Sequence, residues 1–158
     1  MTFIIGATGN VGSEVIKRLQ LKGRVVKGLT RKPPTSSNHW ILGDLEKPAS
    51  YATELEGEEE LILITPAHPD MVMHQVGALK AAKTAGVKHV VKLSGLGAGP
   101  DAPIRLPKLH YEIEQEIIAS GIDYTFIRPN LFSQVLLGAA ETINKNGRNL
   151  CAGGRWCN

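Results

Sequence analysis

Short apolar runs alternate with amphipathic stretches along most of this chain. The apolar runs are typical of buried strands and span residues 3–5, 25–29, 39–42, 61–65, 87–94 and 123–128. Between them, apolar residues recur at helical spacing and predict helices at 11–22, 70–85 and 108–120, with a weak helix at 49–55. Phe132, Leu136, Ala140 and Ile143 would form the apolar stripe of a last helix.

Six short strands separated by helices predict an α/β fold with a doubly wound parallel sheet. Right-handed crossovers and a glycine turn after the first strand favour the Rossmann strand order 3-2-1-4-5-6. A ligand crevice would then lie beyond the carboxyl ends of the strands. We expect one NAD(P)-binding domain over residues 1–146 and an irregular tail over residues 147–158, where no clear period is present.

The first strand leads directly into Gly-Ala-Thr-Gly-Asn-Val-Gly at residues 6–12. Gly6 permits a tight turn, Gly9 lets the backbone approach a pyrophosphate, and Gly12 lets the new helix pack closely. The helix N-terminus would present free N–H groups and a partial positive charge to the phosphates. This pattern favours a dinucleotide site, and the alternative is a tight turn without a ligand.

The residues after the second strand bear on the choice of dinucleotide. An NAD site usually has a carboxylate there for the ribose hydroxyls, but the chain has no acidic residue between Glu14 and Asp44. Arg31 stands near the expected place, and a guanidinium can bind a 2′-phosphate. NADP(H) is therefore favoured over NAD(H), the alternative being that Arg31 belongs to a solvated loop. Asp44 could accept from the adenine amino group while Leu45 packs on the ring, or Asp44 could cap the following helix.

Composition, net charge and cysteine content favour some classes of protein over others. The 158 residues are 42% hydrophobic and 21% charged, as in an ordinary globular domain. A net charge of +3 without interleaved aromatic residues does not favour nucleic-acid binding. No segment approaches the apolar length of a membrane span. The two cysteines, Cys151 and Cys157, lack companion zinc ligands and fit a reducing compartment, so we expect a cytoplasmic protein without a metal site.

Several motifs together resemble the NmrA-like, atypical short-chain dehydrogenase family, and within it the NAD(P)H:quinone oxidoreductase branch. The motifs are the glycine turn, Gly43-Asp44-Leu45, AKTAGV at 82–87, Leu93-Ser94, His110-x-Glu112-x-Glu114 and SGIDYTFIRP at 120–129. The resemblance covers residues 1 to about 146, and in that family the chain continues into a smaller substrate-covering part. We therefore expect this chain to be a truncated or frameshifted product, or a fragment, that lacks that part.

The resemblance also implies site residues. Cofactor contacts are implied at Gly6, Thr8, Gly9, Asn10, Val11 and Gly12. Arg31 is implied near the 2′-phosphate, Asp44 and Leu45 at adenine, and Thr65, Pro66 and Ala67 near the nicotinamide ribose. His110 and the segment Asn130-Leu131-Phe132 would line the nicotinamide end.

The sequence contains only some of the catalytic residues that typical short-chain dehydrogenases share. Typical short-chain dehydrogenases share Ser…Tyr-x-x-x-Lys, in which the lysine lowers the pKa of the tyrosine that donates a proton. Ser94 and Tyr111 match this pattern, but Gln115 stands where the lysine belongs. His110 and Glu114 are four residues apart on one helix face, and they are either a polar pair near the nicotinamide or an ordinary surface pair.

Two functions follow from these residues. The first is an oxidoreductase that passes hydride from NADPH to a quinone-like acceptor, which needs orientation of two rings more than a tuned proton donor. The second is a non-catalytic dinucleotide-binding redox sensor or regulator of the NmrA type. Ser94, His110 and Tyr111 are the candidate catalytic residues of the first.

Overall fold

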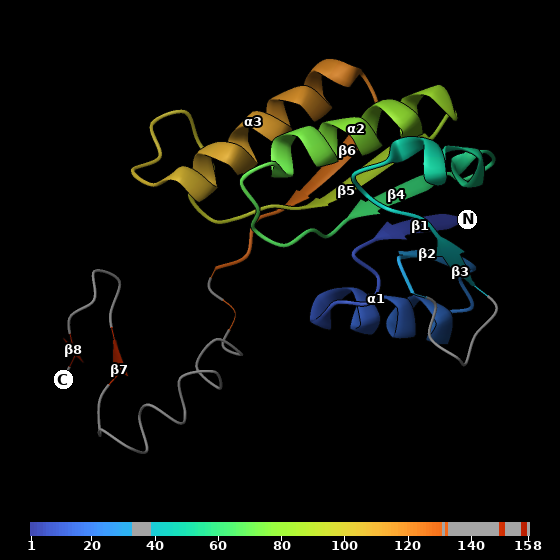
Figure 1. The fold of residues 1–158 in the computed structure, drawn as a ribbon, viewed down its shortest axis with the longest axis horizontal. Helices are drawn as coiled ribbons and strands as arrows, with labels where there is room; N and C mark the ends of the chain where they lie inside the picture. The colour runs from blue at the N-terminus through green and yellow to red at the C-terminus, as the bar shows by residue number, and fades with distance from the viewer. Residues whose placement is uncertain (33–38, 131, 133–148, 151–155, 158) are drawn as a thin grey trace. The chain divides into compact units, whose positions relative to one another are not determined.

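A parallel sheet of six strands is the centre of the computed structural model, which describes residues 1–32, 39–130, 132, 149–150 and 156–157. The strands are β1 (Thr2–Ile5), β2 (Val26–Thr30), β3 (Trp40–Leu42), β4 (Glu60–Leu63), β5 (His89–Leu93) and β6 (Asp123–Ile127). They lie in the order β3-β2-β1-β4-β5-β6, and each neighbouring pair is parallel (Figure 1). The predicted α/β class and strand order are confirmed.

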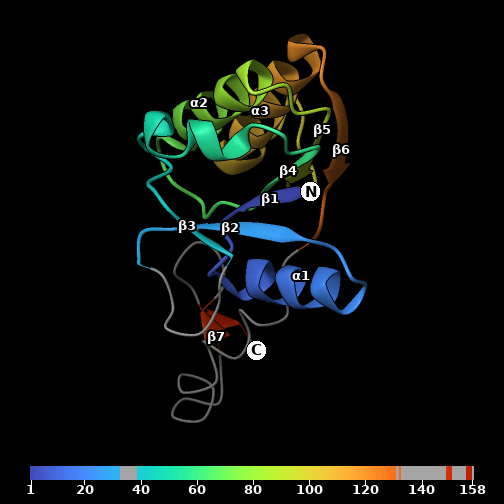
Figure 2. The ribbon, with the colours of Figure 1, turned by 90° about the vertical axis from the view of Figure 1, so that its right-hand side faces the viewer.

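Helices cover both faces of this sheet. Helix α1 (Asn10–Leu21) lies on one face, and α2 (Met71–Thr84) and α3 (Arg105–Ser120) lie on the other (Figure 2). Helix α3 begins three residues earlier than predicted and contains Pro107 in its first turn. Proline is tolerated there because the first N–H groups of a helix have no intrahelical partner.

The predicted weak helix at 49–55 is instead a pair of 3₁₀ helices, η1 (Pro48–Ser50) and η2 (Ala52–Leu55). Between them, Tyr51 leaves helical geometry with φ −140° and ψ 2°. Its side chain is fully buried and its ring stacks on Phe3, with centroids 6.1 Å apart. Burial of a large aromatic ring thus outweighs continuation of the helix at this point.

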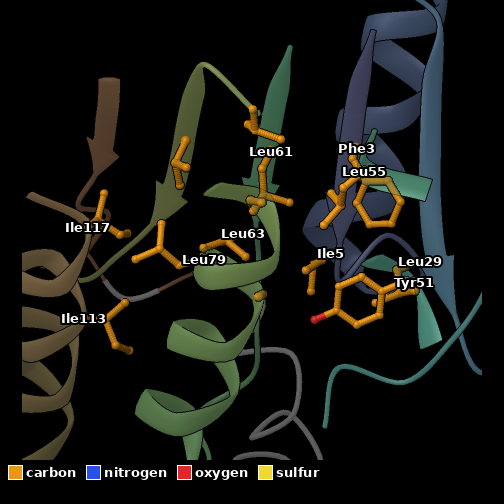
Figure 3. Close-up of a cluster of buried hydrophobic side chains, with 14 of the residues drawn as sticks. Phe3, Ile5, Leu29, Tyr51, Leu55, Leu61, Leu63, Leu79, Ile113 and Ile117 are labelled. Atoms are coloured by element: carbon orange, nitrogen blue, oxygen red, sulfur yellow. The ribbon is translucent and has the colours of Figure 1, made fainter. Parts of the chain in front are cut away.

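The larger core fills the space between the sheet and α2 and α3 (Figure 3). Alternate residues of β1 and β4 point into it, and they meet Leu79 of α2 and Ile113 and Ile117 of α3. A smaller core on the other face combines Ile4 with the apolar side of α1. Because both faces of β1 are buried, all four of its residues are inaccessible to solvent.

The chain divides into two compact units, Met1–Arg128, which contains the sheet, and Pro129–Asn158. In the second unit, β7 (Asn149–Leu150) pairs antiparallel with β8 (Trp156–Cys157), where the sequence analysis expected an irregular tail. The predicted last helix falls, apart from Phe132, outside the described residues. In the part of the chain that the structure describes, no helix has the length and apolar character needed to cross a bilayer.

Candidate functional site

The turn between β1 and α1 needs two of its glycines for its own packing. Gly6 has φ +81°, and a Cβ there would lie 1.6 Å from the carbonyl oxygen of Ile64. A Cβ on Gly12 would lie 2.1 Å from the carbonyl oxygen of Gly6. Both positions therefore exclude side chains for reasons internal to the protein, so they alone do not indicate a ligand.

Gly9 is different because no described residue of the protein requires it to be glycine. Its backbone is extended, with φ −76° and ψ 170°, and among the described residues a Cβ there would meet only the Gly6 carbonyl oxygen, at 3.4 Å. Gly9, Thr8 and Asn10 are exposed, and no side chain caps the N-terminus of α1. The first N–H groups of that helix thus remain available. An open glycine beside an uncapped helix N-terminus fits a dinucleotide's phosphates.

Arg31 lies at the same edge of the sheet as the glycine turn. It follows the last residue of β2, which runs parallel to β1 and next to it. The hydroxyl of Thr30 fixes the backbone on both sides of Arg31: it accepts from the Lys32 N–H at 3.2 Å and donates to the Lys32 carbonyl at 2.9 Å. Within the described residues the exposed Arg31 guanidinium has no hydrogen bond or ion pair.

Asp44 follows β3 at this same edge and organises a turn. Its Oδ1 accepts from the Glu46 N–H at 3.1 Å, and its own N–H donates to the hydroxyl of Ser50 at 2.9 Å. The N-cap residue of the next helix, η1, is Lys47, so the alternative that Asp44 caps a helix is wrong. Leu45 is half-buried against the larger core.

A chain of hydrogen bonds joins the carboxyl ends of β4 and β5 through α2. Gln75 of α2 donates from Nε2 to the hydroxyl of Thr65 at 2.6 Å. Its Oε1 accepts from Lys92 Nζ at 3.0 Å, and Lys92 Nζ also lies 3.2 Å from His110 Nδ1 on α3. Lys92 and Gln75 are almost completely inaccessible to solvent. Thr65 and His110 are thus linked through two buried side chains.

The protonation of this chain is shifted by its burial. Desolvation lowers the pKa of Lys92 to about 8, although the negative charge of Glu114 opposes the shift. Desolvation, together with the positive charge of Lys92, lowers the pKa of His110 to about 4. At neutral pH, His110 is therefore a neutral imidazole beside a lysine that is close to its titration range.

A second buried cluster lies next to the first and centres on Glu114. The fully buried carboxylate accepts from the Ser94 hydroxyl at 2.6 Å and from Arg128 at the end of β6. Arg128 binds it with both Nε and Nη2, at 3.0 Å and 2.5 Å. The interpretation of His110 and Glu114 as an ordinary surface pair is therefore wrong, because Glu114 is buried and bound to other partners.

Tyr111 takes no part in either cluster. Its hydroxyl has no hydrogen-bond partner among the described residues, and Gln115 one turn later is exposed. Lys92 of β5 places an ammonium group 3.2 Å from Nδ1 of His110, the residue before Tyr111. Asn130 belongs to the second unit, so its predicted place at the nicotinamide end stays a prediction.

Sequence reasoning missed Lys92, Gln75 and Arg128. A signal for Lys92 was present, because it stands between Val90 and Ser94 on the inward side of an otherwise apolar strand. A lysine at such a position is almost never buried without partners. Gln75 and Arg128 carry no such signal, since their roles depend on which strands and helices become neighbours.

Residues 6–149 match the model of a family described as NAD(P)H-binding. The chain is 35% identical over 153 residues to an NAD(P)H azoreductase of Xenophilus azovorans, covering 93% of this chain and 54% of the relative. It is 31% identical over 163 residues to quinone oxidoreductase 2 of Escherichia coli, covering 98% of this chain and 57% of the relative. The chain thus spans about half the length of these curated relatives.

Solved structures of two reductases superimpose on most of this chain. An Escherichia coli NADPH-dependent quinone oxidoreductase in complex with NADPH superimposes with a TM-score of 0.83 at 29% identity, over 93% of this chain and 55% of that one. A Citrobacter triphenylmethane reductase complexed with NADP(H) gives a TM-score of 0.79 at 25% identity, over 91% and 54%.

Proposed function

Because this chain belongs to the NAD(P)H-binding family of NmrA-like, atypical short-chain dehydrogenases, we propose that it is an NADPH-dependent oxidoreductase. Hydride would pass from the dinucleotide to a quinone-like acceptor. The observation that supports this proposal best is the edge of the sheet where the exposed Gly9 turn follows β1 and Arg31, which has no side-chain partner among the described residues, follows the neighbouring β2. Relatives described as an NAD(P)H azoreductase and as quinone oxidoreductase 2 support this proposal.

The cofactor would lie across the carboxyl ends of the strands, with its pyrophosphate on the N–H groups at the start of α1. Arg31 would bind the 2′-phosphate, because it is an exposed cation that no described residue pairs with. Asp44 and Leu45 would hold the adenine, and Thr65 would face the nicotinamide ribose. When bound, the cofactor supplies a hydride, and the protein supplies position and electrostatics.

A quinone suits the groups around His110. A hydride acceptor of this kind forms a stabilised hydroquinone anion, so the hydride transfer itself depends mainly on the orientation of two rings, and protonation of the anion is a separate, later step. The Tyr111 hydroxyl has no hydrogen-bond partner among the described residues, and Gln115 stands where typical short-chain dehydrogenases have the lysine that activates this tyrosine, which argues against ordinary ketones as substrates. The missing lysine at Gln115 equally favours a second function, a redox sensor that binds the dinucleotide without turnover.

Titration of the full chain with NADPH and NADH by nucleotide fluorescence tests the cofactor proposal. We expect tighter binding of NADPH, and Arg31→Ala should remove about 1.5–3 kcal/mol of that preference, or roughly 10- to 150-fold in Kd. Lys22→Ala is a matched control, because Lys22 is an exposed cation at the opposite end of α1. Equal affinities for the two nucleotides in the unaltered protein would contradict the role of Arg31.

A further inference from the structure

Lys92 is a buried cation at the ligand edge of the sheet whose charge is only partly compensated. From α2 it is faced by the neutral Gln75, and from α3 by His110 and Glu114. The Glu114 carboxylate is already committed to Ser94 and to the Arg128 guanidinium at the end of β6. A buried charge of this kind is costly and needs an explanation beyond packing.

The position of Lys92 determines which nitrogen of His110 carries the proton. An ammonium can only donate, so Nδ1, 3.2 Å from Lys92 Nζ, is the acceptor and the ring proton of the neutral imidazole lies on Nε2. Nε2 has no partner among the described residues. That edge of the ring lies against Gly95, where an added Cβ would be 3.1 Å from Cδ2 and 3.5 Å from Nε2. Any side chain at position 95 would crowd the donor.

We propose that Lys92 and His110 form a proton relay that protonates the reduced acceptor, with His110 Nε2–H as the donor and Lys92 as its proton source. This inference rests on the proposed oxidoreductase function. The relay would take the place of the tyrosine acid of typical short-chain dehydrogenases only toward a hydroquinone anion, which is a much weaker base than the alkoxide of a reduced ketone. His110 is the catalytic residue, since it would touch the acceptor. Lys92 acts through His110.

The quinone gains a hydride, hence two electrons, and NADPH is oxidised to NADP⁺. The resulting hydroquinone monoanion takes the Nε2 proton: an O–H bond forms and the Nε2–H bond breaks. At the same time a Lys92 N–H bond breaks and an Nδ1–H bond forms, which leaves a neutral amine. Water then protonates Nε2 while the Nδ1 proton moves back to the Lys92 amine. The overall reaction therefore consumes one proton from solvent.

The electrostatics of the pair agree with this assignment. Burial lowers the pKa of Lys92 to about 8, so the ammonium is a much better proton source near neutral pH than an exposed lysine. Burial and the charge of Lys92 lower the pKa of His110 to about 4, which keeps the ring neutral and able to pass a proton through.

Reduction of menadione by the full chain with NADPH tests the relay. The variants are His110→Asn, whose amide oxygen can still accept from Lys92, Lys92→Met, and the double variant, with the exposed Lys88→Met as the control. We expect NADPH Kd to stay within about twofold in all of them, whereas kcat falls about 10²-fold in each single variant and no further in the double variant. The wild-type kcat should fall above about pH 8, and Lys92→Met should lose that limb.

A readout that needs no turnover is the ¹⁵N NMR spectrum of His110 in the nucleotide-free chain. It should show the neutral Nε2–H tautomer at neutral pH, and in Lys92→Met the pKa of His110 should rise. An Nδ1–H tautomer, additive losses, or an unchanged pH profile in Lys92→Met would overturn the relay alone. A wild-type chain that neither binds NADPH nor reduces menadione would overturn the proposed function, and the relay with it, even if the tautomer is as expected.

Discussion

Gly9 and Gly12 lie three residues apart in the same turn, but their surroundings differ. Gly12 is enclosed by the backbone of Gly6 and Ala7, whereas a Cβ on Gly9 would make one ordinary contact among the described residues, with the Gly6 carbonyl oxygen at 3.4 Å. The sequence predicted both as ligand-related, because a spacing of glycines cannot distinguish a packing requirement from room for a ligand. Only the positions of neighbouring backbone atoms make that distinction.

Gly9→Val should therefore abolish NADPH binding and leave the fold intact. The extended backbone of Gly9 accepts a β-branched residue, and the added side chain would occupy the space proposed for the pyrophosphate. Isothermal titration and circular dichroism of the same sample check the two halves of the prediction.

Gly12→Val is the matched control, because its Cβ would collide with the Gly6 carbonyl oxygen. We expect it to lower the free energy of unfolding by on the order of 3 kcal/mol. Normal NADPH affinity in Gly9→Val would show that the turn is purely structural.

Residue-level prediction was least successful for buried polar groups. His110 and Ser94 were recognised as candidates from their motifs, yet Lys92 was overlooked and Glu114 was treated as potentially exposed. The i, i+4 spacing of His110 and Glu114 correctly places them on one helix face, but it does not say what that face meets. Here that face of the helix packs toward β5 and β6. Lys92 lies in β5, and Ser94 and Arg128 directly follow β5 and β6.

At the scale of elements, α3 links the core to the site. Its residues Ile113 and Ile117 are buried in the larger core, and on the same helix His110 and Glu114 bind side chains from the ends of β5 and β6. The helix was predicted from its apolar periodicity, and its earlier start at Arg105 was not, because proline in the first turn hides the boundary. Packing of the apolar residues therefore fixes the register in which the polar ones meet the sheet.

This arrangement predicts how stability depends on pH. The pKa of His110 is about 4 in the folded chain and near 6.5 when unfolded, so between these values the unfolded chain binds more protons. The free energy of unfolding should therefore fall as pH drops from about 6.5 to about 4, by on the order of 2 kcal/mol from this residue. Urea unfolding at a series of pH values measures the slope.

His110→Asn should flatten that slope, because asparagine does not titrate and still accepts from Lys92. His74→Asn is the matched substitution for comparison, since the ring of His74 stacks on that of His68. An identical slope in wild type and His110→Asn would show that His110 is not held neutral by its surroundings.

At the scale of the whole molecule, the alternation of apolar runs with amphipathic stretches was sufficient to predict the sheet and its order. Parallel strands with right-handed crossovers leave few arrangements once the glycine turn fixes the first strand. The local structure around Tyr51 was not predictable in this way, because a ring that leaves a helix to enter the core responds to tertiary packing. The pairing of β7 with β8 likewise has no periodic signal in so short a segment.

The most direct test of the account is steady-state NADPH oxidation by the full chain, measured with menadione and, in parallel, with a simple ketone such as cyclohexanone. We expect NADPH consumption that depends on the quinone, a ketone rate near background, and a quinone rate nearly unchanged in Tyr111→Phe. Fast ketone reduction that collapses in Tyr111→Phe, or NADPH binding with no quinone-dependent consumption, would contradict it.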